Sequence, residues 1–352
     1  MSPNRQNEEK TVGSKVLKVI ITGGCGFIGS HLSDFWIAQG AQVTVIDNLS
    51  TGLRQNLNPQ AHLLEVNLQD LSVAEHGSFF EDVDYVFHLG ALAAIVPSIQ
   101  NPVEYIQANV MGTLKLLEMC RAFPPRKLIY TASGSCYGIP DHYPTLEDAP
   151  IRPEYPYALS KWQGEELVKH WGQVYKLPWI SLRLTNVFGP RSRTDTGYGA
   201  VFGVFLAQIA HGKPLTIVGD GSQSRDFTYV LDVVQAFYKA ATGEIVGEVI
   251  NIGSGNHYSI NYLAELLKPN GLVYVPKRPG EPDITFVDIA KAQTLLGYQP
   301  QWSFEAGVQE MLNQLDFWQE APVWEPESIQ AATEDWFKYL SPQAPAKEAS
   351  HV

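Results

Sequence analysis

The stretch KVIITGGCGFIGSHL, residues 18–32, decides the fold. Its apolar beginning, rich in Val and Ile, predicts a strand that leads directly into a turn containing Gly23, Gly26 and Gly29. Glycine permits the tight turn and lets backbone amides approach a pyrophosphate at the positive end of the following helix. The order of strand, glycine turn and helix therefore predicts a dinucleotide-binding unit.

Further apolar runs follow this unit and alternate with helical patterns. Most of them are apolar throughout, as in strands that are covered on both faces. Strands and helices in alternation predict right-handed crossovers and an α/β fold with a Rossmann-like, doubly wound parallel sheet. The predicted strands span residues 18–23, 42–47, 62–67, 85–90, 127–133 and 179–184.

The pattern changes near residue 186, where connections rich in Gly and Pro join shorter elements. This change predicts a smaller C-terminal α/β substrate lobe that closes over the sheet. We expect a dinucleotide-binding domain over residues 15–185 and a substrate lobe, with some return to the sheet, over residues 186–320. A flexible leader over residues 1–14 and a C-terminal extension over residues 321–352, disordered at its end, complete the expected organisation.

The composition is that of a globular enzyme, since 45% of the 352 residues are hydrophobic and 18% are charged. The formal net charge of -12 opposes binding to nucleic acid or to an anionic membrane, because both need clustered Lys and Arg. The three cysteines lack a CxxC pair and a Cys/His ligand spacing, which predicts no disulfide and no metal site. The sequence has no apolar run of about 18 residues, so we expect no membrane span and a cytoplasmic protein.

Asp47 ends the second predicted strand, 18 residues after Gly29. A carboxylate at this point accepts hydrogen bonds from a ribose 2′-hydroxyl and repels a 2′-phosphate, so NAD is favoured over NADP as the cofactor. The alternative is a structural glycine turn followed by a capping aspartate. If the cofactor is bound here, the residues expected around its adenosine are Asn48, Ser50, Thr51, Gly52, Asn67 and Leu68.

Tyr157 and Lys161 stand four residues apart at the start of a predicted helix, so both side chains lie on one helix face. An ammonium beside a phenol lowers the pKa of the phenol towards the neutral range that a general acid/base needs. Ser133 ends the strand upstream and is expected to bind the same substrate oxygen as Tyr157. We therefore predict Ser133, Tyr157 and Lys161 as the catalytic residues.

Several motifs extend this pattern along the chain: TGGCGFIGSHL, DNLSTG, HLGA, ANVMGT, TASGSCYG, YALSK, RLTNVFGP and SRDFTYVLDV. With them, the chain from about residue 16 to residue 315 resembles the extended short-chain dehydrogenase/reductase family, and especially its nucleotide-sugar epimerases and dehydratases. The resemblance supports the three catalytic residues. It implies further NAD contacts from Phe27, Ile28, Leu89, Ala91, Ala93, Asn109, Tyr157 and Lys161.

The resemblance also implies a nucleotide-diphosphate sugar, UDP-linked in the closest-fitting branch, as the small-molecule partner. Two arginines suit a diphosphate because their forked donors neutralise it through paired hydrogen bonds. A homodimer that pairs through the helices predicted over residues 108–123 and 157–175 is implied as well. The implied substrate contacts are Ser133, Ser135, Asn186, Thr216, Val218, Arg225, Arg278 and Thr285.

The residues after Ser133 bear on the reaction. In the 4,6-dehydratases that the chain resembles, an Asp-Glu pair follows the active-site hydroxyl, and decarboxylases usually keep a Glu at the second position. Here Gly134 and Ser135 stand at these positions, and neither transfers a proton at carbon. Cys136 is one position late for the catalytic cysteine of related 3,5-epimerases, which favours a packing role. The remaining chemistry is oxidation at C4, rotation of the keto-sugar and hydride return to its other face, which is 4-epimerisation.

The identity of the sugar is less defined. Thr285 matches a position beside the C2 group where a bulky Tyr excludes N-acetylated sugars, so a small Thr admits UDP-GlcNAc/GalNAc as well as UDP-Glc/Gal. The uncharged residues from Ile95 to Ser98 favour instead a deoxy-sugar or another modified hexose. A 4,6-dehydratase, a decarboxylase and a 4-keto-reductase on the same fold remain alternatives, as does a non-catalytic NAD-binding protein.

Overall fold

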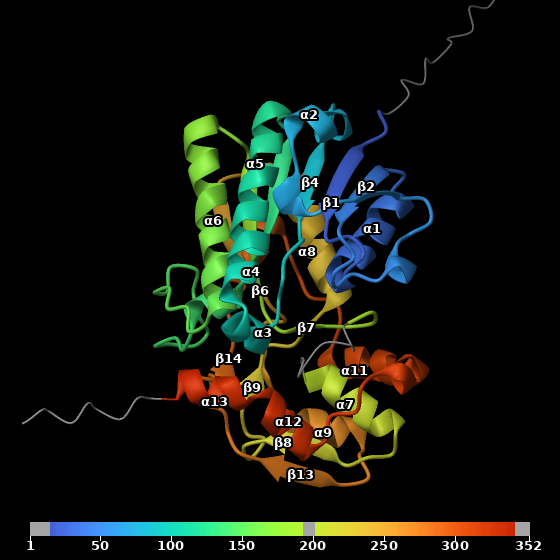
Figure 1. Ribbon diagram of the computed structural model, residues 1–352, viewed down its shortest axis with the longest axis vertical. Helices are drawn as coiled ribbons and strands as arrows, with labels where there is room; N and C mark the ends of the chain where they lie inside the picture. The colour runs from blue at the N-terminus through green and yellow to red at the C-terminus, as the bar shows by residue number, and fades with distance from the viewer. Residues whose placement is uncertain (1–14, 193–200, 342–352) are drawn as a thin grey trace, which may run out of the picture.

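The computed structural model describes residues 15–192 and 201–341. A large sheet covered by helices forms the upper part of the molecule in Figure 1, and a smaller lobe lies below it. The expected flexible leader, residues 1–14, and the end of the C-terminal tail, residues 342–352, lie outside the described residues.

The large sheet has seven parallel strands in the order β11-β6-β5-β4-β1-β2-β3, which confirms the predicted doubly wound fold. The strand order reverses between β1 and β4, and an open α/β sheet binds its ligands outside the carboxyl ends of the strands at such a point. The strands are β1 (Lys18–Thr22), β2 (Gln42–Asp47), β3 (His62–Glu65), β4 (Tyr85–His88), β5 (Lys127–Ser133), β6 (Trp179–Leu184) and β11 (Glu248–Ile252).

Helices cover both faces of this sheet. Helices α1 (Phe27–Ala38) and α8 (Val230–Thr242) pack on one face, whereas α5 (Gly112–Ala122) and α6 (Pro156–Tyr175) pack side by side on the other (Figure 1). Successive side chains of β1 therefore enter different cores. Val19 lies in the core under α1 and α8, and Ile20 lies in the core under α5 and α6. Burial of each such side chain stabilises the fold by about 1.5–3 kcal/mol, which explains why the strands are apolar throughout.

The smaller lobe is built from short strand pairs and helices around an aromatic core. Phe188, Phe202, Phe227 and Phe304 lie in this core, and the rings of Phe188 and Phe202 stack with centroids 4.5 Å apart. Its strands are β7 (Val187–Phe188), β8 (Leu215–Val218), β9 (Ser224–Arg225), β10 (Thr228–Tyr229), β12 (Tyr258–Ser259), β13 (Leu272–Val275) and β14 (Ile284–Thr285). Its helices are α7 (Val201–Ala210), α9 (Ile260–Leu267) and α11 (Phe304–Asn313).

The chain crosses between the two parts more than once. After β10 it forms α8 and then β11, which pairs with β6 at the edge of the large sheet. The segment from β10 to β11 therefore links the smaller lobe back to the large sheet. Short elements complete the sheet part: η1 (Arg54–Asn56), η2 (Leu68–Asp70), α2 (Val73–His76), η3 (Gly77–Phe80), α3 (Ile95–Gln100), α4 (Pro102–Tyr105), η4 (Ile106–Met111), η5 (Gly134–Tyr137) and α10 (Ala290–Leu296).

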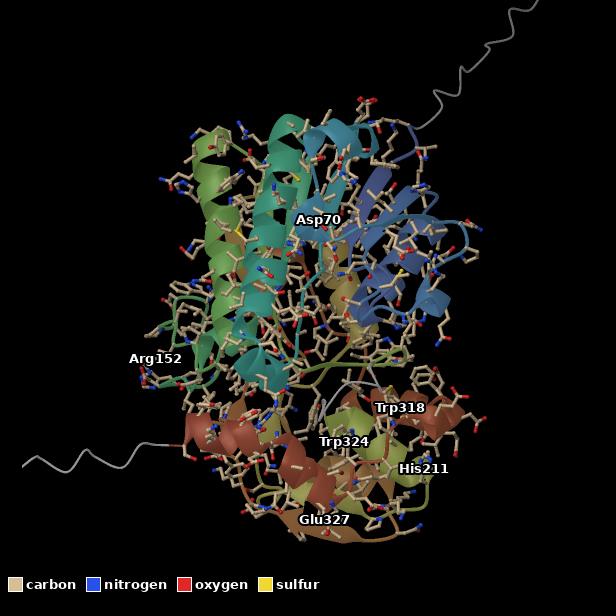
Figure 2. All side chains as sticks on the ribbon, viewed as in Figure 1. Asp70, Arg152, His211, Trp318, Trp324 and Glu327 are labelled. Atoms are coloured by element: carbon tan, nitrogen blue, oxygen red, sulfur yellow. The ribbon has the colours of Figure 1, made fainter. Side chains whose placement is uncertain are left out.

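The C-terminal segment continues past α11 as η6 (Leu315–Glu320), α12 (Pro326–Ala332) and α13 (Glu334–Leu340). Trp318 and Trp324 of this segment lie in the lower lobe (Figure 2), and Trp318 is buried in the aromatic core. The segment then turns upward, so that α13 ends close to α3 of the sheet part (Figure 1).

Candidate active site

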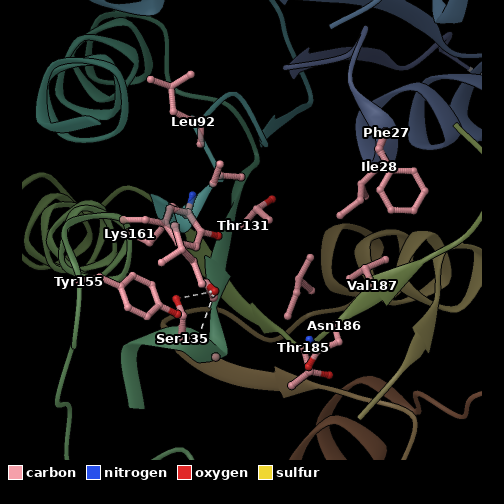
Figure 3. Close-up of a pocket in the computed structure, with 18 of the residues that line it drawn as sticks. Phe27, Ile28, Leu92, Thr131, Ser135, Tyr155, Lys161, Thr185, Asn186 and Val187 are labelled. Carbon is pink, nitrogen blue, oxygen red and sulfur yellow. Dashed lines mark hydrogen bonds between the residues drawn. The ribbon is translucent and has the colours of Figure 1, made fainter. Parts of the chain in front are cut away.

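A cleft of about 810 Å³ lies between the carboxyl ends of the large sheet and the smaller lobe. Except for Asn109, every residue predicted to bind the cofactor or the substrate lines this cleft. Figure 3 shows the two walls: Lys161, Tyr155 and Ser135 on one side, and Phe27, Ile28 and Asn186 on the other. Residues that were predicted from separate motifs of the sequence therefore lie around one cavity.

The glycine turn between β1 and α1 forms one end of the cleft. Gly23 has a φ of +69°, which other residues rarely adopt. A Cβ atom added to Gly29 would lie 2.2 Å from the carbonyl oxygen of Gly23, so only glycine fits there. Gly26 caps α1 without a side-chain hydrogen bond, which leaves the amides of the first turn to an anion. These residues fit the pyrophosphate of NAD.

Asp47 lies beside this turn at the end of β2. Its Oδ2 accepts a hydrogen bond from the amide of Cys25 at 2.9 Å, and its Oδ1 accepts one from the amide of Leu49 at 2.9 Å. Burial raises the pKa of Asp47, while these two amide hydrogen bonds act in the opposite direction. A carboxylate held in this way is oriented before a ribose arrives, so the predicted role of Asp47 fits its geometry.

The loops after β2 and β3 lie against each other next to Asp47. The side-chain amide of Asn48 donates to Oδ1 of Asn67 at 2.9 Å, and Asn48 accepts a hydrogen bond from the amide of Ser50 at 3.0 Å. These contacts connect the two loops at the place where the adenosine is expected. The predicted adenosine residues Asn48, Ser50, Thr51, Gly52, Asn67 and Leu68 all line the cleft.

Asn109 is the exception among the predicted cofactor residues. It is buried in η4, a single stretch of π-helix, and its side-chain amide donates to the carbonyl of Leu92 and to Oγ of Ser160, each at 2.9 Å. Ser160 in turn donates to the carbonyl of Tyr157 at 2.8 Å. Asn109 therefore holds the loop after β4 against the start of α6 and does not itself line the cleft.

The predicted catalytic residues lie together at the centre of the cleft. Ser133 ends β5, while Tyr157 and Lys161 stand in the first turns of α6, which starts at Pro156 with the φ that a first helical position needs. The hydroxyls of Ser133 and Ser135 are 2.8 Å apart. Burial raises the pKa of Tyr157, and its side-chain hydrogen bond with Ser133 opposes this shift.

Lys161 differs from the expectation drawn from the spacing alone. Burial lowers its pKa to about 7, with Glu165 acting in the opposite direction, and its ammonium lies over the ring of Tyr130 at 4.6 Å from the centroid. The predicted lowering of the Tyr157 pKa by Lys161 is therefore not seen: burial raises this pKa, and it is Ser133 that opposes the rise. The sequence did not single out Tyr130, which also holds this helix turn through a 3.0 Å hydrogen bond to the carbonyl of Lys161.

The other end of the cleft carries two arginines from the smaller lobe. Arg225 of β9 donates to Glu281 at 2.8 Å, and Arg278 lies 3.6 Å from the same carboxylate. Two guanidinium groups converging on one acidic side chain provide the donors that a diphosphate needs. Glu281 was not predicted from the sequence. The remaining predicted substrate residues Asn186, Thr216, Val218 and Thr285 also line the cleft.

The two residues directly after Ser133 offer no acid or base. Gly134 and Ser135 line the cleft, whereas Cys136 is buried against Tyr137 and Val287. Burial raises the pKa of Cys136 to about 12, which keeps the thiol protonated at neutral pH. The side chain of Cys136 is therefore in the packed interior, as predicted, but Cys136 lies in the short helix η5 and not in the extended segment that the sequence suggested.

Two aromatic residues of the cleft were missed by the sequence reasoning. The ring of Tyr155 stacks with that of Tyr157, with centroids 6.4 Å apart, and Trp336 of α13 lies 6.3 Å from Tyr155. The only local signal for Tyr155 is its place two residues before Tyr157. Trp336 has no local signal, because only the path of the C-terminal segment brings it to the cleft. The apolar residues Ile95 and Val96 of α3 line the same wall.

Over residues 15–192 and 201–341, no group of three or more His, Cys, Asp or Glu side chains is placed to hold a metal ion. Over the same residues, no helix combines the length and the apolar character needed to cross a membrane.

Comparison with known proteins agrees with this geometry. A family model described as the NAD dependent epimerase/dehydratase family matches residues 19–253. A putative UDP-glucose 4-epimerase of Methanocaldococcus jannaschii is 36% identical over 301 residues, which are 84% of this chain and 97% of that protein. Among solved structures, the UDP-glucose 4-epimerase of Thermotoga maritima with UDP-glucose has 34% identity and a TM-score of 0.81, covering 86% of this chain and 99% of that one.

A second solved structure is similar to the same degree. The UDP-N-acetylglucosamine 4-epimerase of Methanobrevibacter ruminantium, in complex with UDP-N-acetylmuramic acid, has 34% identity and a TM-score of 0.81. It matches 86% of this chain and 99% of its own. The matched part contains the glycine turn, the strand that carries Ser133 and the helix that carries Tyr157 and Lys161. This chain belongs to the NAD dependent epimerase/dehydratase family.

Proposed function

We propose that this protein is an NAD-dependent nucleotide-sugar 4-epimerase that acts on UDP-GlcNAc/GalNAc or UDP-Glc/Gal. The observation that carries this proposal is the order of groups along one cleft. A glycine turn with Asp47 stands at one end, Ser133, Tyr157 and Lys161 at the centre, and Arg225 with Arg278 at the other end. A hexose whose diphosphate lies on the arginines reaches Tyr157, next to the dinucleotide site.

In the oxidation step the phenol oxygen of Tyr157 accepts the proton of the sugar O4 while a hydride leaves C4. The hydroxyl of Ser133 binds the same sugar oxygen and, through its hydrogen bond with Tyr157, favours the ionised phenol. NAD, held by the glycine turn and Asp47, would supply the hydride acceptor for this step and the hydride donor for its reversal. After the keto-sugar rotates, Tyr157 gives the proton back to O4, so that the reaction consumes neither cofactor nor acid.

The choice of epimerisation over the related reactions depends on Gly134 and Ser135. Elimination of water and loss of carbon dioxide need an acid or a base beside the carbon, and these two residues offer neither. Solved relatives of this chain include a UDP-glucose 4-epimerase and a UDP-N-acetylglucosamine 4-epimerase, which supports UDP as the carrier and both sugar classes as candidates.

We also propose that the enzyme is a cytoplasmic homodimer. Helices α5 and α6 lie side by side on one outer face of the sheet, and Met111, Val174 and Tyr175 near their ends are exposed. Pairing of this face with a second copy would cover them and form a four-helix bundle. The three cysteines are buried without disulfides, which suits a reducing compartment.

The test is to incubate the purified protein with UDP-glucose or UDP-GlcNAc without added cofactor and to follow the products by NMR. The expected result is a 4-epimer of the substrate that accumulates to equilibrium, with one bound NAD serving many turnovers. Net consumption of added NADH, release of carbon dioxide from UDP-glucuronate, or a stable 4-keto-6-deoxy product would contradict it in favour of a reductase, a decarboxylase or a dehydratase.

A further inference from the structure

The C-terminal segment brings a third wall to the substrate end of the cleft. The relatives described above match 84–86% of this chain although 97–99% of their own length is matched, so part of this chain has no counterpart in them. The sequence resemblance to the family ends near residue 315, which is where η6, α12 and α13 begin. These elements lie beyond the part of the chain in which the sequence resembles the family.

The C-terminal segment, η6 to α13, is firmly attached to the smaller lobe. Trp318 and Ile329 are buried in the aromatic core, and the side-chain amide of Gln208 in α7 donates to the carbonyl of Trp324 at 2.6 Å. Figure 2 shows Trp318 and Trp324 within this lobe. Because the start of the segment is fixed in this way, the position of α13 follows from packing.

Helix α13 contacts both sides of the cleft. On the sheet side, Gln100 of α3 donates to Asp335 at 2.9 Å. On the lobe side, the indole N–H of Trp336 donates to the carbonyl of Pro279 at 2.7 Å. Figure 1 shows α13 at the junction of the two parts, next to α3. The helix therefore spans the cleft at the end where the diphosphate and the sugar are expected.

Trp336 is the residue by which α13 lines the cleft. It is 4% exposed. The guanidinium of Arg278 lies over its ring at 5.3 Å from the centroid, and its other neighbour is the ring of Tyr155. A guanidinium over an indole ring is held by cation–π attraction and by the flat contact of two planar groups. Trp336 thus fixes the plane of a side chain whose forked donors must match a phosphate.

We propose that Trp336 is a positioning residue for nucleotide-sugar binding, which holds Arg278 in the orientation that receives the diphosphate. The inference rests on the proposed function only in taking a nucleoside diphosphate as the ligand of the two arginines. In this proposal the C-terminal segment, η6 to α13, contributes to substrate affinity, while the chemistry stays with Tyr157.

The first test measures UDP binding by calorimetry, which needs no turnover. We expect Trp336→Ala to raise the Kd for UDP about tenfold, in line with the loss of a buried cation–π contact. Tyr339→Ala is the matched control, since Tyr339 stands on the same helix but is 58% exposed, and it should bind UDP like the wild type. Trp336→Leu keeps apolar volume without a ring face and replaces the alanine variant if that variant fails to fold.

A double-mutant cycle tests whether Trp336 acts through Arg278. In the Arg278→Ala background, the further change Trp336→Ala should alter the Kd for UDP by less than about twofold.

In turnover, Trp336→Ala should raise KM and leave kcat within about twofold, because Tyr157 is untouched. A folded Trp336→Ala or Trp336→Leu variant with wild-type UDP affinity would overturn the inference. So would a rise in the Kd for UDP on Trp336→Ala that is as large in the Arg278→Ala background as in the wild type. UDP binding without turnover of any sugar would count against the proposed function alone, because the double-mutant cycle measures only the Kd for UDP.

Discussion

The two ends of the cleft are built in different ways. The dinucleotide end is made from the carboxyl ends of neighbouring parallel strands and the turns directly after them, as with Gly23 after β1 and Asp47 at the end of β2. The substrate end joins Arg225 of β9, Arg278 of a loop and Trp336 of α13, which are far apart along the chain. A local strand–turn–helix unit thus defines the first end, whereas only long-range packing assembles the second. Substitutions should therefore affect the two ends separately.

The largest effect is expected where the two ends meet. Tyr157→Phe removes the group that exchanges a proton with the sugar O4, so epimerisation should fall by at least about 100-fold. Product formation followed by NMR measures this loss. Bound NAD, released by acid and assayed, and the Kd for UDP should both remain near their wild-type values, because the glycine turn, Asp47 and the two arginines are unchanged. A variant with near wild-type turnover would remove the basis of the proposed mechanism.

A steric change should break the dinucleotide end alone. The added Cβ of Gly29→Ala would lie 2.2 Å from the Gly23 carbonyl oxygen, so the turn must shift. We expect the protein to be purified without NAD and to lose about 1–3 kcal/mol of unfolding free energy, measured by urea denaturation. The Kd for UDP should change little. Gly271→Ala is the control, because its Cβ would lie 3.6 Å from Pro214, an ordinary contact. Retention of full NAD occupancy in Gly29→Ala would contradict the assignment of the turn.

A change in the substrate end should alter selectivity with less effect on overall activity. Thr285 lines the cleft on β14, beside Arg225 of β9 in the parallel register. Thr285→Tyr should lower kcat/KM for UDP-GlcNAc about tenfold through steric exclusion, and that for UDP-glucose by less than about threefold. Thr285→Ser serves as the control that keeps the space. Equal losses for the two sugars would show that Thr285 is not beside the C2 substituent.

The smallest expected effect concerns Lys161 and the pH dependence of stability. Its pKa is lowered to about 7 in the folded protein, chiefly by burial, so between pH 7 and the pKa of the unfolded chain the unfolded state binds more protons. Stability should therefore rise with pH across that window, by about 1 kcal/mol per pH unit from this group. In Lys161→Met this contribution should disappear. Urea denaturation of NAD-free protein at pH 7 and pH 9 compares the two slopes. Parallel slopes would argue for a lysine that keeps its ordinary pKa.

The amino-acid sequence by itself determined the parallel sheet and the dinucleotide end. Apolar runs, glycines and a carboxylate after a strand act within a few residues of each other, so their spacing already implies their geometry. The four-residue spacing of Tyr157 and Lys161 likewise places both on one face of α6.

Only the tertiary structure decided that Lys161 turns towards Tyr130 and that Asn109 supports a loop without lining the cleft. It also decided that Glu281 joins the two arginines and that Trp336 reaches them from the far end of the chain. These contacts join residues whose separation along the chain carries no periodic signal, and they form only when the two parts of the molecule pack together.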